Sequence, residues 1–228
     1  MRLSILFRQI ICLGFCFLVF PSFVDAQIIG IKDFKERKAR ADSIANALKD
    51  GVLVIRLKSY RNNLEAMDKS LASRQLSKKE RKRLQKTRDM MVNDRDRFNN
   101  ELVQAFDTLY NFSKFRIMYD TASHLLLSGV ESGYFLNNQL ELDPKISLEK
   151  QQPFAILGEG SRNKEGVHGL VVYDAEGEVV PAPFPSFFDF RNHRRGLLSL
   201  FRGNAYIRKS GDILARKINS RFKSFHRN

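Results

Sequence analysis

Cysteine is nearly absent from this chain of 228 residues, and tryptophan is absent altogether. The two cysteines, Cys12 and Cys16, both lie near the start, in an apolar run of eleven residues from Ile10 to Phe20. At about 1.5 Å per helical residue, this run covers only about half of a ~30 Å hydrocarbon core. It is therefore too short for a typical membrane span.

Residues 1–26 instead have the pattern of a secretory signal peptide, with basic residues first, the apolar run next and small residues before Gln27. We expect cleavage after Ala26 and export to the periplasm or out of the cell. An uncleaved anchor is the alternative. A lipoprotein is disfavoured, because Phe15 precedes Cys16 where a small residue is needed.

Cleavage leaves 202 residues (228 − 26) with no cysteine. That excludes a disulfide scaffold, a thiol nucleophile, a zinc site with cysteine ligands and CxxC redox chemistry in the mature chain. A hydrophobic core must stabilise the fold, and about 200 residues are enough to build one. We therefore expect residues 27–228 to form a single domain.

Positive charge is what the chain has in excess, and it is segregated. Lysine and arginine number 39 against 25 acidic residues, a formal charge of +14. Residues 56–97 hold 14 basic and 6 acidic side chains (+8), whereas residues 98–190 hold 6 and 13 (−7). Residues 191–228 hold 11 and 1 (+10). Two basic blocks thus flank an acidic centre, a pattern that indicates an anionic partner or surface.

The first basic block has a helical pattern. Residues 60–106 predict a charged helical hairpin or a bent helix, interrupted near Ser73 and restarted by a capping box formed by Ser77 and Glu80. The apolar stripe is thin, so we expect only the later part to be well buried. The basic side chains form either an ordinary solvated face or a binding face for acidic partners.

The second basic block ends in the segment 207–228, which is predicted to be an amphipathic helix with Ser210 as its N-terminal cap. One face is apolar and the other sides carry arginine and lysine. Such a helix can lie on an anionic membrane or dock its apolar side on the sheet, and docking is the favoured interpretation. The expected apolar face consists of Ile213, Leu214, Ile218, Phe222 and Phe225.

Short β-branched and aromatic runs predict the strands, after a first helix at residues 31–49. The runs are residues 52–57, 115–119, 153–158, 169–173 and 178–180, the last two joined by a turn at Asp174–Gly177. Prolines at 181, 183 and 185 then predict that the chain leaves the sheet. The expected class is α/β, with a mixed sheet of four or five strands and the helical hairpin as an insertion.

In layout, the pieces GVLVIRLKSYRNNLEAM (51–67), FRIMYD and PAPFPSFF resemble a group of uncharacterised exported proteins from Bacteroidetes. That resemblance implies the compartment and the fold but no activity. The order strand, long helix, strand, strand, strand and helix also looks like a thioredoxin-type arrangement. Without a CxxC pair in the mature chain, that resemblance implies no redox function.

Candidate catalytic residues are few. Glu159, His168 and Asp174, in or beside the glycine-rich segment 158–174, could cluster as an acid/base group of a hydrolase. No histidine pair has helical zinc spacing, so neither a metal nor a cofactor is predicted. An enzyme is therefore the alternative hypothesis, and a non-catalytic binding or structural protein is the main one.

The binding hypothesis assigns the two basic helices to anionic envelope components, such as a membrane surface, or to an acidic protein or glycan. Nucleic acid is not expected as a partner, because the compartment is wrong and no aromatic-basic recognition motif is present. The predicted anion-binding residues are Lys78, Lys79, Arg81, Lys82, Arg83, Arg216, Lys217, Arg221 and Lys223.

Overall fold

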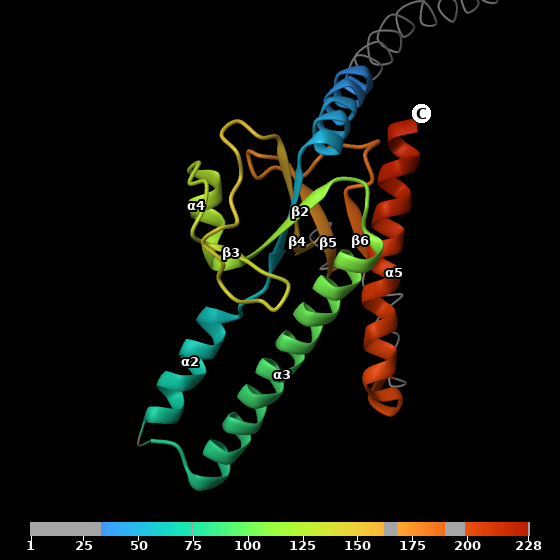
Figure 1. Ribbon diagram of the computed structural model, residues 1–228. Helices are drawn as coiled ribbons and strands as arrows, with labels where there is room; N and C mark the ends of the chain where they lie inside the picture. The colour runs from blue at the N-terminus through green and yellow to red at the C-terminus, as the bar shows by residue number, and fades with distance from the viewer. Residues whose placement is uncertain (1–32, 74, 162–167, 190–198, 228) are drawn as a thin grey trace, which may run out of the picture.

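A six-stranded mixed sheet forms the centre of the molecule, in the order β3-β2-β1-β4-β5-β6. The computed structural model describes residues 33–73, 75–161, 168–189 and 199–227 (Figure 1). The predicted signal peptide lies outside these residues. The strands are β1 (Val52–Leu57), β2 (Lys114–Tyr119), β3 (Phe135–Leu136), β4 (Phe154–Ser161), β5 (His168–Tyr173) and β6 (Phe187–Asp189).

Strand β1 is central and runs parallel to both β2 and β4, while β3, β5 and β6 join antiparallel. All of its residues are buried except Arg56, which is half-buried. Because β1 is covered on both faces of the sheet, almost all of its residues must be apolar. The α/β class and the mixed sheet are therefore confirmed, with six strands in place of the four or five expected.

Two hydrophobic clusters cover the two faces of the sheet. On one face, residues 33–50, which are helical, pack with α3 (Lys78–Leu109) and α5 (Ser199–Arg227). The other face is covered by a 3₁₀ turn (Asp120–Ala122), by α4 (Ser123–Leu127) and by buried residues up to Leu148. Figure 1 shows α4 on the opposite side of the sheet from α5.

Helix α5 docks its apolar side in the core, as expected. Leu214, Ile218 and Phe222 are at most 1% exposed, and Phe225 is half-buried. Two details of the prediction are wrong. Ile213 is 48% exposed, and the helix begins at Ser199, so Ser210 lies inside it and is not its cap.

Helices α2 (Arg61–Ala72) and α3 form the predicted helical hairpin, and together they extend away from the sheet to a shared tip (Figure 1). The capping box is confirmed: the Ser77 hydroxyl accepts from the Glu80 backbone N–H, and the Glu80 carboxylate accepts from the Ser77 N–H at 3.0 Å. No residue of α2 is buried, and the buried residues of α3 begin at Asn99. We call α2 together with α3 up to Asn99 the arm.

Three other sequence predictions need correction. Strand β4 continues through residues 159–161, beyond the predicted end at residue 158, and pairs there with β5, while 162–167 lie outside the described residues. Residues 178–180 form only an isolated bridge, Tyr173 with Val179, beyond the predicted turn. After the three prolines the chain does not leave the sheet, because β6 pairs with β5 at its edge. Among the described residues, no helix is both long and apolar enough to span a bilayer.

Candidate functional site

Five cations of α3 form one exposed surface at the tip of the arm. At about 100° per residue, they fall within a sector of about 140° on the helix, roughly opposite the side that faces α2. All five are exposed, and none makes a side-chain hydrogen bond or ion pair with another described residue. We call this surface the arm patch: Lys78, Lys79, Lys82, Arg83 and Lys86.

Two further arginines of the same stretch point the other way and stabilise the hairpin. The Arg81 guanidinium donates to the carbonyls of Leu71 and Ser73, where α2 ends, and so caps that helix. The Arg88 Nε lies 2.5 Å from Asp68 Oδ1, which joins α3 to α2. Arg81, predicted as an anion-binding residue, therefore has a structural task.

The carboxylates of the arm are also engaged away from the arm patch. The hydrogen bond from Arg88 lowers the pKa of Asp68, and the hydrogen bonds from Ser77 lower the pKa of Glu80. The guanidinium of Arg61 likewise lowers the pKa of Glu65. Each acid is thus held ionised by a neighbour outside the arm patch.

A second basic surface lies on the outer side of α5. Arg216, Lys223 and Arg227 line a shallow hollow of about 460 Å³ with Ser220 and Ser224, and no carboxylate lines it. At about 100° per residue, Arg216, Ser220, Lys223 and Arg227 fall within about 60° of one another, opposite the buried face. We call this surface the α5 stripe: Arg216, Ser220, Lys223, Ser224 and Arg227.

The other two predicted cations of α5 lie outside the stripe. Arg221 is on the flank near the edge strand β6, with its guanidinium carbon 5.9 Å from the centre of the Phe188 ring. Lys217 is half-buried, on the same flank as the exposed Ile213. The predicted anion-binding set is therefore not one continuous surface. The arm patch begins about 35 Å along α3 from Leu109, which borders the α5 stripe.

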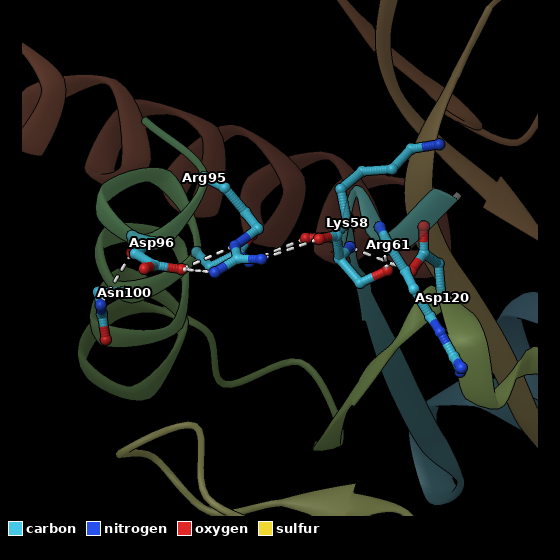
Figure 2. Close-up of polar contacts among 8 residues, drawn as sticks. Lys58, Arg61, Arg95, Asp96, Asn100 and Asp120 are labelled. Atoms are coloured by element: carbon cyan, nitrogen blue, oxygen red, sulfur yellow. Dashed lines mark hydrogen bonds and ion pairs between the residues drawn. The ribbon is translucent and has the colours of Figure 1, made fainter. Parts of the chain in front are cut away.

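A polar pocket that sequence reasoning missed lies where β1 and β2 end (Figure 2). Three side chains hold the backbone after β1. The Ser59 N–H donates to Asp120 Oδ1 at 3.0 Å, Arg95 Nη1 donates to the Ser59 carbonyl at 3.0 Å, and Asn99 Nδ2 donates to the Lys58 carbonyl at 3.1 Å. The carboxyl ends of parallel strands are a common place for ligands in α/β folds.

The pocket measures about 500 Å³, and Tyr60 beside it has a left-handed backbone with φ of 53°. Among its charged residues, Arg61 pairs with Glu65 at 2.7 Å, and Asp120 accepts the Ser59 N–H. The lining is Lys58, Ser59, Tyr60, Arg61, Asn62, Asn63, Glu65, Asp120 and Thr121. The only sequence signal for it is the polar run that follows β1.

The three candidate catalytic residues do not form one cluster. Glu159 and His168 lie near each other on the β4–β5 pair, where Ser161 is opposite His168. Asp174 follows the other end of β5, about 20 Å from His168 at ~3.3 Å per residue. It is 3% exposed and accepts from the N–H of Glu178 at 2.9 Å.

Asp174 is also bound to Arg40 of the first helix at 2.5 Å, so it fixes the turn after β5 and ties that turn to the helix. No group of three metal-ligating side chains occurs in the part of the chain that the structure describes.

Comparison with known proteins adds no relative: no protein-family model, no curated protein and no solved structure matches this chain.

Proposed function

We propose that this protein is an exported, non-catalytic binding protein whose basic surfaces contact anionic envelope components or an acidic partner. The observation that carries the proposal is that the cations of these surfaces lack ion-pair partners among the described residues. The arm patch and the α5 stripe together hold eight cationic side chains, and none of them forms an ion pair with another described residue.

Export rests on the signal-peptide pattern of residues 1–26 and on the resemblance in layout to exported Bacteroidetes proteins. A thioredoxin-like arrangement rests on the order of the elements alone and stays a prediction. Export and a thioredoxin-like arrangement without CxxC are both compatible with a binding protein, since neither implies a catalytic group.

The alternative, an extracytoplasmic hydrolase using residues 158–174, has less support. A general acid/base pair needs its two groups within reach of one substrate. Of its three candidates, Asp174 is committed to the turn after β5 and to Arg40. The hydrolase hypothesis is then left with Glu159 and His168.

The test is co-sedimentation of the chain, starting at Gln27, with vesicles. Phosphatidylglycerol–phosphatidylcholine vesicles are compared with pure phosphatidylcholine at low salt and at about 1 M salt, where the Debye length is only about 3 Å. We expect binding to the anionic vesicles that is lost at high salt. Equal binding to both kinds of vesicle, or binding unchanged by salt, would contradict the proposal.

A further inference from the structure

The arm patch and the α5 stripe differ in whether the fold itself explains their charge. Helix dipoles favour cations near a C-terminus and disfavour them near an N-terminus. The α5 stripe runs toward the C-terminal end of its helix, where His226 and Arg227 occupy the last turn. The dipole therefore favours the charge of Arg227, although Lys223 and Arg227 are themselves like charges four residues apart.

The arm patch, by contrast, begins at the N-terminus of its helix, where the helix dipole disfavours positive charge. Lys78 and Lys79 are the first two residues of α3, beside the positive end of the helix dipole. Along the patch, Lys78 and Lys82, Lys79 and Arg83, and Lys82 and Lys86 are like charges four residues apart, a spacing that destabilises a helix. Glu80 in the same turn offsets part of this charge, but it is engaged by Ser77, and none of the five cations forms an ion pair with another described residue. An external anion is therefore the natural counterpart.

The position of the arm keeps this charge from being cancelled by the acidic centre of the sequence. The arm patch lies about 20–30 Å along α3 beyond Asn99, the first buried residue of that helix. That is two to three times the Debye length of about 8–10 Å at physiological salt. Two acids that lie closer have cationic neighbours outside the arm patch, Asp89 in Arg88 at 3.7 Å and Asp94 in Arg97 at 2.7 Å.

The shape and chemistry of the arm patch fit an extended anionic surface. It is the convex outer side of a projecting helix, and four of its five cations are lysines, which bind as mobile point charges without a bidentate geometry. None of the five lines the hollow on α5 or the pocket after β1. Lysines on an amphipathic or juxtamembrane helix attract anionic lipid headgroups in this way.

We infer that the arm patch is a peripheral membrane contact: Lys78, Lys79, Lys82, Arg83 and Lys86 bind the headgroup layer of an anionic bilayer and hold the sheet domain away from it. The inference rests on the proposed function and sharpens it, because it assigns lipid binding to the arm patch and not to the α5 stripe. Contact is electrostatic, without insertion, because the patch is entirely charged.

The experiment compares two variants with the same change of charge. In the arm variant, Lys78→Gln, Lys82→Gln and Lys86→Gln are combined. In the control variant, Arg216→Gln, Lys223→Gln and Arg227→Gln are combined. Partitioning of each chain, starting at Gln27, onto phosphatidylglycerol–phosphatidylcholine vesicles is measured by co-sedimentation at low salt. We expect the arm variant to bind on the order of 100-fold more weakly, and the control to stay within about threefold of the unaltered chain.

Urea unfolding keeps this result separate from a folding defect. Because the substitutions remove like-charge pairs from an exposed surface, we expect the arm variant to unfold at the same or a slightly higher urea concentration. Loss of binding in the control variant alone, or equal loss in both variants, would overturn the assignment to the arm while leaving the proposed function intact. Arm-dependent binding to soluble polyglutamate without binding to vesicles would overturn the membrane assignment. No binding by the unaltered chain to vesicles or to polyglutamate would refute both proposals.

Discussion

Replacing Phe222 by alanine tests whether the apolar side of α5 belongs to the core. Phe222 is fully buried. Its ring centre lies 5.0 Å from that of Phe184, 5.6 Å from that of Phe112 and 6.1 Å from that of Phe188. These neighbouring rings come from two separate parts of the chain, residue 112 and residues 184–188, so Phe222 joins α5 to both.

The expected cost follows from this setting. Truncating a buried phenylalanine to alanine costs about 3–5 kcal/mol, and ring pairs of this geometry contribute beyond the buried area. We therefore expect Phe222→Ala to lower the free energy of unfolding by about 4–5 kcal/mol. Ile213→Ala, at a side chain that is 48% exposed on the same helix, should cost less than about 1 kcal/mol.

Urea unfolding followed by circular dichroism measures both variants. With a slope of about 2 kcal/mol per molar urea, Phe222→Ala should lower the midpoint by about 2 M and Ile213→Ala by less than about 0.5 M. Equal, small shifts in the two variants would refute docking of α5. They would favour the other arrangement that the sequence allows, in which the apolar side lies on a membrane.

Three further outcomes follow from local contacts. Ser77→Ala removes one half of the capping box and should destabilise the first turn of α3 by about 1 kcal/mol, seen as faster amide exchange there, whereas Ser77→Asp should preserve protection. Asp174→Asn loses the charge that accepts the N–H groups of the turn after β5, and should lower the free energy of unfolding by about 1–3 kcal/mol. Because Arg88 lowers the pKa of Asp68 below its ordinary value of 3.8, their bond stabilises the arm above that pH and is lost as the pH falls through the lowered pKa. Carbon NMR titration should show the low pKa of Asp68 and its return toward the ordinary value in Arg88→Gln; an unchanged titration would contradict the pairing.

The sequence predicted best those features that depend on neighbours along the chain. The capping box of Ser77 and Glu80 needs residues only three positions apart, and β1 is an uninterrupted apolar run whose bounds, Val52–Leu57, match the prediction. The docked face of α5 was also predictable, because burial follows the helical period at Leu214, Ile218 and Phe222.

Features set by distant contacts were missed. Strand β6 has three residues and exists through pairing with β5, as in Phe188 opposite Leu170. The beginning of α5 was placed too late because Ser210-Gly211 has the composition of a helix start. Gly211 serves another purpose there, since a Cβ on it would lie 3.0 Å from the Glu101 carbonyl, where α5 passes α3.

In the candidate surfaces too, local features were predictable from the sequence and features that depend on distant contacts were not. Composition identified the two basic helices, but it could not separate Arg81, which caps α2, from Lys82 next to it in the arm patch. That distinction depends on which side of α3 faces α2. The pocket after β1 brings Ser59 together with Asp120, 61 positions apart, so no local pattern marks it.

The arm also has a topological role, because it is part of the crossover that connects β1 to β2. Parallel neighbouring strands cannot be joined by a tight turn, so a crossover connection is obligatory here, but its length beyond about a dozen residues is not fixed. Inserting seven residues into each of α2 and α3, two helical turns, would keep the facing sides aligned and move the tip outward by about 10 Å. The hairpin is in this sense a spacer of adjustable length, and its length sets the height at which the sheet domain would stand above a bound surface.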